Sequence, residues 1–175
     1  MIQKSKIIGI GGVSCAGKSH LADELSFHLR EAGFNTIVID QDDYVFPTAE
    51  IPLVRDHTDW ECPESIDFDS FEDAIKNASS SHDIVLAGGL MVFWESRINS
   101  IFDYRIFIKI PRDEFRRRKR KDLRWGREPD WYIDHIWDSY LEYGQFPYGI
   151  QPNLSIDGTG TFNTDLICKK ILSAH

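Results

Sequence analysis

The sequence predicts an α/β fold in which a parallel five-stranded sheet carries helices on both faces. Short apolar segments alternate with amphipathic ones along the chain, and strands that alternate with helices pair in parallel. The length of 175 residues and the hydrophobic share of 42% suit one domain with a single core. A glycine-rich segment at 9–17 separates the first strand from the first helix, which is typical of α/β folds that bind phosphate.

The first half of the chain contains three predicted strands and two predicted helices. The strands are the apolar runs at 6–12, 35–40 and 83–89. The first helix spans 17–33, where Leu21, Leu25 and Leu29 share one face and Gly33 is a natural stop. The second spans 65–79 and begins with helix-capping residues. Residues 44–65 contain three prolines and little periodicity, so they are predicted mainly as a long loop.

The second half repeats the alternation. Two further strands are predicted at 104–110 and 153–157. The predicted helices are a short one within 95–103, a basic one at 112–123, an aromatic-rich one after the proline break within 127–146, and a closing one within 162–175. The whole chain, residues 1–175, is therefore expected to form a single domain.

Charge and cysteine content narrow the class of protein. The net charge of −8 argues against bulk binding to nucleic acid or to an anionic membrane. Three cysteines are too few for a disulfide framework, and an odd number cannot all pair within the chain. This favours a reducing compartment. The N-terminal residues lack the apolar core and cleavage site of a signal peptide, and no apolar run approaches about 18 residues. We therefore expect a cytoplasmic protein without a membrane segment.

The segment "GVSCAGKS" fits the phosphate-loop pattern G-x-x-x-x-G-K-[ST] without a mismatch. Glycines let backbone N–H groups approach phosphate oxygens, and the following helix directs its positive end at the same anion. Lysine and serine at the end of the pattern suit the terminal phosphates and Mg²⁺. The motif predicts a P-loop nucleoside triphosphate hydrolase fold that binds ATP through Gly12, Val13, Ser14, Cys15, Ala16, Gly17, Lys18, Ser19 and His20.

Three aspartates follow the second predicted strand, in "IVIDQDDYVF". Ligands of open α/β sheets bind at the carboxyl ends of the strands, where Asp40, Asp42 and Asp43 are expected. A kinase acting on an alcohol needs a carboxylate near the attacking hydroxyl and further acids near Mg²⁺. The alternative, a solvated acidic turn, is less consistent with a phosphate loop one βα unit earlier.

Several motifs together resemble the nicotinamide riboside kinases, which belong to the uridine kinase-like group of P-loop kinases. They are "GGVSCAGKS", "DQDDY", "DWECPESIDF", "WYIDHIWDSYLEY" and "IDGT", and they occur in this order along nearly the whole chain. The phosphate loop is specific only for phosphate, whereas "QDDY" followed by "WECPESIDF" is more specific to the riboside kinases. The resemblance implies transfer of a phosphoryl group from ATP, with Mg²⁺, to the 5′-hydroxyl of a nucleoside.

The resemblance also implies roles for individual residues. Asp42 is similar to the family's catalytic carboxylate, with Lys18 as its partner in catalysis, while Ser19, Asp40 and Asp42 are expected to hold the metal. Trp60 and Glu61 fall where the family places an aromatic residue and an acid, normally Asp, against the nucleoside. Packing under the loop is an equally open interpretation of Trp60. The expected nucleoside-binding residues are Asp42, Tyr44, Trp60, Glu61 and Tyr132.

One departure from the family concerns an acid. The family reads acid-Gly after the third strand, as in "EGFLL", whereas this sequence reads "VLAGGLMVF", which assigns Ala87 to the position of the acid. Three consequences stay open: Asp40, Asp42 or Asp43 suffices, a different substrate is used, or the chain is a weak or inactive kinase. We favour the first, because losing one electrostatic group usually leaves residual catalysis.

A basic segment is expected to close over the triphosphate. Residues 112–127 contain nine of the twenty lysines and arginines, and a lid needs cations that neutralise the transferring phosphoryl group. The lid is placed at about 112–130, with Arg120, Arg124 and Arg127 as the phosphate contacts. A nucleic-acid patch is the alternative, disfavoured because the rest of the chain is acidic. The "IDGT" loop, with Asp157, Gly158 and Thr159, is similar to the loop flanking adenine in the family.

These observations predict a nucleoside kinase that converts nicotinamide riboside to nicotinamide mononucleotide, a step of NAD biosynthesis. The expected partner is the small nucleoside, and the chain is expected to be a monomer or homodimer that binds neither nucleic acid nor membrane. The alternatives are a uridine or other small-metabolite kinase, or a nucleotide-binding module weakened by Ala87.

Overall fold

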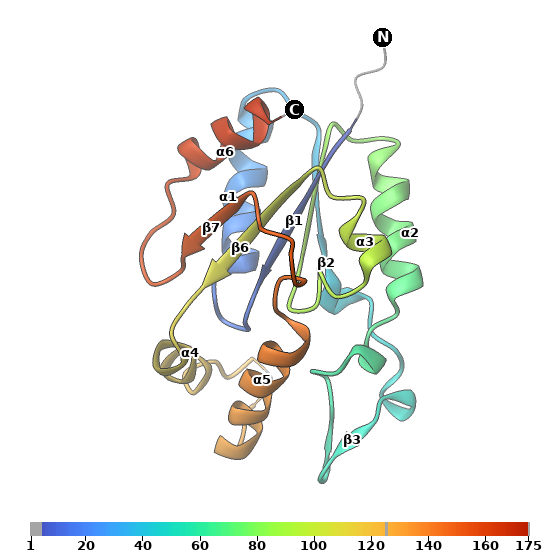
Figure 1. Ribbon diagram of the computed structural model, residues 1–175, viewed down its shortest axis with the longest axis vertical. Coiled ribbons are helices and arrows are strands. Elements are labelled where there is room, and N and C mark those ends of the chain that lie inside the picture. The colour runs from blue at the N-terminus through green and yellow to red at the C-terminus, as the bar shows by residue number, and fades with distance from the viewer. Residues whose placement is uncertain (1–4, 125, 175) are drawn as a thin grey trace.

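The computed structural model describes residues 5–124 and 126–174 and has a central five-stranded parallel sheet (Figure 1). The sheet order is β2-β5-β1-β6-β7, and every neighbouring pair is parallel. The strands are β1 Lys6–Gly12, β2 Thr36–Asp40, β5 Ile84–Gly89, β6 Tyr104–Lys109 and β7 Leu154–Asp157. The predicted fold class is therefore confirmed.

Helices cover both faces of the sheet. They are α1 Lys18–Glu31, α2 Phe68–Ser79, α3 Ser96–Asn99, α4 Arg112–Lys119, α5 Asp130–Tyr143 and α6 Thr164–Ser173. The connections β1-α1-β2 and β2-α2-β5 cross the sheet in opposite directions, and right-handed crossovers then put α1 and α2 on opposite faces. α6 packs beside α1, and α3 lies beside α2 (Figure 1). No helix among the described residues is long and apolar enough to cross a membrane.

The core follows from the apolar periodicity of these elements. β1 lies at the centre of the sheet, where Ile8 and Ile10 are fully buried, as expected for a parallel strand covered on both faces. Leu21, Leu25 and Leu29 of α1 are also fully buried, which confirms their predicted place on the inward face. His28, which the helical spacing predicts on the same face, is exposed.

Two predicted elements differ from the structure. The segment 44–65 is not only loop, because it contains a small antiparallel hairpin, β3 Leu53–Val54 and β4 His57–Thr58, and two 3₁₀ turns, Thr48–Glu50 and Pro63–Ser65. The basic helix ends at Lys119 rather than continuing to 123. Two-residue strands are too short to leave an alternation in the sequence. Basic residues favour the last turn of a helix, but a continuous basic run such as 116–121 does not show at which residue the helix ends.

The strands of the sheet all end at the same edge. The phosphate loop, the 3₁₀ turn Gln41–Asp43 (η1) after β2, and the segment after β5 follow these carboxyl ends. α4, α5 and the β3–β4 hairpin lie at this end of the molecule, in the lower part of Figure 1. This edge therefore gathers almost all of the predicted site residues.

Candidate active site

The phosphate loop between β1 and α1 has the backbone that its glycines predict. Gly12 has a φ of 148°, and a Cβ there would lie 2.5 Å from the carbonyl oxygen of Ile108, so this position accepts only glycine. Gly17 has a φ of 103° and is the N-cap of α1. Cys15 has a φ of 59°, and its Sγ lies 3.6 Å from Asp122 Oδ2. The loop therefore leads into the positive end of a 14-residue helix.

Lys18 begins α1 and turns back over the loop. Its Nζ donates a hydrogen bond to the carbonyl oxygen of Val13 at 3.0 Å. Desolvation lowers the pKa of Lys18, and the charges of Asp42 and Asp40 oppose this effect. The two aspartates predicted to act with Lys18 therefore lie close enough to influence it electrostatically.

The first turn of α1 presents two further predicted residues. Ser19 is exposed, so its hydroxyl is accessible at the mouth of the loop. His20 is also exposed, and its Nε2 lies 3.6 Å from Glu24 Oε1, one helical turn further on. The imidazole of His20 thus lies along the helix surface, which leaves its backbone as the part nearest the loop.

The aspartates after β2 are organised by the short turn η1. Asp40 Oδ1 accepts the N–H of Asp42 at 3.1 Å, which caps the turn. Gln41 points inward, where its Oε1 accepts the N–H of Met91 at 3.0 Å, whereas Asp42 and Asp43 point away from the core, and Asp42 lies where Lys18 and Asp40 influence its carboxyl group. Desolvation and the neighbouring Asp40 raise the pKa of Asp42, against the opposing charge of Lys18.

The oxygen donors at this edge fit a hard divalent cation. Asp40 and Asp42 act electrostatically on Lys18, which Ser19 follows directly. Mg²⁺ in kinases is held by one or two protein oxygens, with phosphates and waters completing the shell. In the described residues no group of three or more His, Cys, Asp or Glu side chains could hold a metal without such additional ligands.

The structure corrects the assignment of the missing acid to Ala87. Ala87 is fully buried in the core, where a carboxylate would be desolvated without a partner. Gly88 is half-buried at the strand end, in register with Ile10 and Asp40, and a Cβ there would meet only Ile10 O at 3.7 Å. Because Gly89 follows it, Gly88 also satisfies the acid-Gly spacing. The position open to an acid is thus Gly88.

Glu61 lies in residues 59–67, the loop between the hairpin and α2 that is here called the acceptor loop. Its carboxyl group has a strongly shifted pKa. Desolvation raises its pKa to about 7, and the charge of Asp42 adds to this rise. The positive charges of Lys119 and Lys18 act in the opposite direction. Glu61 therefore faces the same space as the phosphate-loop lysine and the catalytic candidate Asp42. A strongly perturbed carboxyl among such groups is typical of a functional site.

Two aromatic residues predicted to contact the nucleoside differ in exposure. The side chain of Trp60 is 40% exposed and is available to a ligand. Tyr44 is half-buried, and its ring centroid lies 5.5 Å from that of Phe71 in the core. Tyr44 also accepts the N–H of Asp67 at its carbonyl oxygen, at 2.9 Å. The ring of Tyr44 therefore packs against the core beside Phe71.

Tyr132 of α5 packs against the hairpin, contrary to the expected contact with the nucleoside. It is only 3% exposed, and its hydroxyl donates to the carbonyl oxygen of Thr58 at 3.2 Å. The neighbouring Trp131, which the sequence did not single out, also contacts the hairpin. The Arg55 guanidinium lies 4.4 Å from its ring centroid, and the His57 ring lies 4.8 Å away, edge-on. Helical periodicity marked both aromatics as apolar but could not predict that both contact the hairpin.

The predicted lid arginines lie on the surface around α4. Arg120 Nε donates to Asp130 at 3.1 Å, and Arg124 donates through Nε and Nη2 to both oxygens of Asp122, at 2.8 and 2.7 Å. Arg127 is exposed. Of the three, Arg124 is placed nearest the site, because the charge of Asp42 acts on its guanidinium.

Two cations of α4 that the sequence did not single out reach inward. Arg118 donates to Cys15 O at 3.2 Å and to Gly158 O at 2.8 Å, so it joins the phosphate loop to the "IDGT" loop. Lys119 is only 6% exposed, with its Nζ 4.0 Å from Asp122. The available signal was the position of Arg118 three residues after a phenylalanine, on the inner face of the helix.

The "IDGT" loop lies against the phosphate loop. Asp157 Oδ1 accepts both the N–H and the hydroxyl of Thr159, at 2.9 and 2.7 Å. A Cβ at Gly158 would lie 2.7 Å from Ala16 O and 2.7 Å from Ile108 Cγ2, so glycine is what permits this close approach. The predicted adenine-flanking residues are thus brought beside the phosphate loop.

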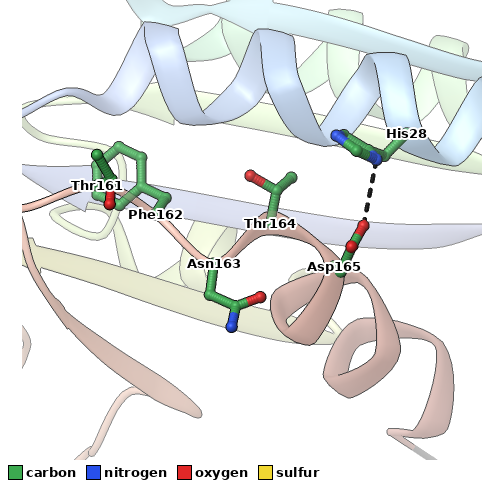
Figure 2. A pocket seen from close by; sticks show the side chains of 6 residues that line it. All are labelled: His28, Thr161, Phe162, Asn163, Thr164 and Asp165. Atoms are coloured by element: carbon green, nitrogen blue, oxygen red, sulfur yellow. Dashed lines mark ion pairs between the residues drawn. The ribbon is translucent and has the colours of Figure 1, made fainter.

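An open pocket of about 440 Å³ lies beside this loop, between α1 and the start of α6 (Figure 2). It is lined by His28 and the segment 161–165, and His28 Nδ1 lies 3.3 Å from Asp165 Oδ1. It contains none of the predicted site residues. The candidate active site is the carboxyl edge of the sheet.

Comparison with known proteins shows which proteins this chain resembles. No family model matches the sequence. Human nicotinamide riboside kinase 1 is 29% identical, over 81% of this chain and 78% of that protein. Uridine kinase of Borreliella burgdorferi is 25% identical, over 82% of this chain and 79% of that protein. The solved "possible uridine kinase" of Bacillus stearothermophilus has the same fold, with a TM-score of 0.61 and 18% identity over 90% of this chain and 91% of that one. The chain is therefore similar in sequence to the nicotinamide riboside kinases and the uridine kinases, and it has the fold of the P-loop kinases.

Proposed function

We propose that this kinase transfers the γ-phosphoryl group of ATP to the 5′-hydroxyl of a nucleoside, with nicotinamide riboside as the preferred acceptor. The observation that carries the proposal is the meeting of three groups from different elements. Lys18 of the phosphate loop and Asp42 after β2 act on each other's ionisation, and both act on that of Glu61 in the acceptor loop. A donor site and a candidate acceptor site thus face each other.

The donor side is built by the phosphate loop and α4. Backbone N–H groups of the loop and the N-terminus of α1 bind the β- and γ-phosphates, and Lys18 exchanges its contact with Val13 O for phosphate oxygens. Arg124 stands nearest to this space among the lid arginines and neutralises charge on the transferring group. Arg118 keeps the adenine-flanking loop against the phosphate loop.

Ser19, Asp40 and Asp42 would hold Mg²⁺. When bound, this ion neutralises phosphate charge during phosphoryl transfer. The capping hydrogen bond between Asp40 and the N–H of Asp42 keeps the two carboxylates in a fixed relation to one another. Their distance from the loop is set by Gln41, which anchors the turn to Met91 in the core.

Asp42 serves the acceptor hydroxyl. The 5′-hydroxyl donates to a carboxylate oxygen of Asp42, which orients it toward the γ-phosphorus and takes its proton as the new O–P bond forms. Desolvation raises the pKa of Asp42, which makes it a better proton acceptor than a solvated aspartate. The bond to the leaving β-phosphate oxygen breaks, and ADP carries the electron pair away.

The acceptor loop favours a nucleoside with a positive base. Trp60 is accessible, Glu61 is an acid, and the further acid Asp59 lies in the same turn. The pyridinium ring of nicotinamide riboside is cationic, and aromatic faces and carboxylates attract such cations. Uridine is the second candidate, supported by the uridine kinase relatives. A cytoplasmic location and a monomeric or homodimeric state remain predictions from the sequence.

The test is a coupled assay of ADP release with Mg²⁺-ATP and a panel of nicotinamide riboside, uridine and cytidine. Release with nicotinamide riboside, together with a product heavier by one phosphoryl group, is the expected result. Release with uridine alone would overturn the choice of substrate. ATP binding without release on any nucleoside would leave the chain as a nucleotide-binding module and overturn the kinase mechanism.

A further inference from the structure

One polar pair joins the acceptor loop to α5 across 76 residues of sequence. His135 Nε2 lies 2.8 Å from Asp59 Oδ1, and because a carboxylate only accepts, the imidazole is the donor. The two side chains are sheltered, at 24% and 15% exposed. A charge-assisted hydrogen bond of this length, partly removed from water, is among the stronger side-chain interactions in proteins.

The same carboxylate organises the turn that carries Glu61. Asp59 Oδ1, the atom bonded by His135, also accepts the backbone N–H of Glu61 at 3.1 Å. The carbonyl oxygen of Asp59 accepts from Cys62 Sγ at 3.2 Å, and its N–H donates to Pro52 O at 2.8 Å. Residues 59–62, here called the acceptor turn, are thus built around Asp59.

Docking of α5 against the hairpin does not depend on this pair. The hydroxyl of Tyr132 bonds to Thr58 O, and the rings of Tyr132 and His57 stack 5.5 Å apart. These contacts hold the helix against β4, before the acceptor turn begins. Only the His135 contact ends on the oxygen that holds the Glu61 amide.

We propose that His135 is a positioning residue for the nucleoside: through Asp59 it holds the acceptor turn and so sets the place of Glu61. His135 does not itself touch the reacting atoms. The consequence for acceptor binding rests on the proposed function, whereas the ordering of the turn does not. Without the imidazole, Asp59 keeps its backbone contacts but loses the tie to α5, so the turn and Glu61 become more mobile.

Amide hydrogen exchange tests the ordering without any need for turnover. In His135→Ala we expect the Glu61 amide to exchange about tenfold faster than in the unmodified protein, since a lost charge-assisted hydrogen bond is worth about one decade or more. His135→Gln keeps an N–H donor and should recover most of the protection. Equal protection of the acceptor turn in all three proteins would overturn the proposal. The Gln variant also keeps the test valid if the Ala variant does not fold.

Steady-state kinetics test the consequence for the acceptor. His135→Ala should raise the KM for the nucleoside on the order of tenfold, with less than about a twofold change in the KM for ATP, and Asp59→Asn should give no further loss when combined with it. A matched control is His28→Ala, which removes another His–Asp pair, at 3.3 Å, on the surface between α1 and α6 (Figure 2). This variant should leave both constants unchanged.

The outcomes separate the two proposals. Equal rises in the KM values for nucleoside and ATP, or additive losses in the double variant, would overturn the role of His135 even in an active nucleoside kinase. If the unmodified protein turns over no nucleoside, the proposed function fails. The exchange experiment then still decides whether His135 holds the acceptor turn.

Discussion

Replacing Glu61 with Gln should make the protein more stable at pH 8 while impairing its reaction with a nucleoside. The pKa of Glu61 rises from 4.5 in the unfolded chain to about 7 in the folded protein, chiefly because the side chain is desolvated. A raised carboxyl pKa means that the unfolded chain loses its proton first as the pH increases. The contribution of Glu61 to the free energy of unfolding is therefore most favourable below pH 4.5 and is lost progressively up to about pH 7.

The size of this effect follows from the two pKa values. Each pKa unit corresponds to about 1.36 kcal/mol, so keeping Glu61 ionised costs the folded state about 3 kcal/mol above pH 7. At pH 5 the unfolded carboxyl is already largely ionised, which leaves about 2 to 3 kcal/mol of the change between pH 5 and pH 8. Gln carries no charge at either pH. Its stabilising effect should therefore grow by that amount over the interval.

Urea denaturation of Glu61→Gln and of the unmodified protein at several values between pH 5 and pH 8 measures this difference. The exposed Glu50, in the turn Thr48–Glu50, gives a matched control, since Glu50→Gln should show no such pH dependence. A free-energy difference for Glu61→Gln that stays constant with pH would refute the reasoning. A free-energy difference that falls as the pH rises would also refute it. In that case the attraction of the neighbouring lysines for the ionised Glu61 would exceed the cost of its desolvation.

Three further predictions concern the donor side and the strand end. Gly158→Ala should lower ATP affinity about tenfold, because its Cβ would meet Ala16 O at 2.7 Å; unchanged ATP binding by calorimetry would contradict this. Arg118→Met should raise the KM for ATP about tenfold or more and Arg120→Met less than threefold, since only Arg118 bonds both loops; equal effects in steady-state kinetics would refute it. Ala87→Glu should destabilise by about 3 kcal/mol or more in urea, whereas Gly88→Glu should cost less than 1; the reverse order would restore Ala87 as the acid position.

The donor half of the site could be predicted from the sequence because its chemistry is local. The phosphate loop needs a few residues at fixed spacing, and Gly12 and Lys18 lie where that spacing requires. The sheet and its helices were equally predictable, since Leu21, Leu25 and Leu29 mark one buried face. In such segments the periodicity and the backbone conformation are properties of neighbouring residues.

The long-range contacts of the site, on the donor side as well as the acceptor side, were harder to predict because they join residues that are distant in sequence. Arg118 reaches Gly158 across 40 residues, and His135 reaches Asp59 across 76. Neither contact leaves a pattern in the residues on either side of it. The acid position was assigned to Ala87 instead of Gly88 for a different reason. A shift of one residue along a strand moves a side chain to the opposite face of the sheet. Because two glycines follow Ala87, the acid-Gly motif fits both positions, and the sequence could not show which of the two faces the site.

Two positions differ from the pattern of the nicotinamide riboside kinases: Glu61 stands in place of Asp, and Gly88 in place of an acid. Both affect the balance of negative charge around Lys18. Asp40, Asp42 and Glu61 all lie near the positive charge of Lys18. Desolvation raises the pKa values of Asp42 and Glu61, with a further rise from Asp40 at Asp42 and from Asp42 at Glu61. A further acid at Gly88, in register with Asp40, would raise the pKa of Asp42 again. Such an acid would add an oxygen donor for Mg²⁺, but without the ion it would increase the repulsion among the carboxylates. Under the proposed function, the lack of this acid would leave Mg²⁺ binding to Ser19, Asp40 and Asp42, so a weakened reaction should appear first as a higher Mg²⁺ requirement.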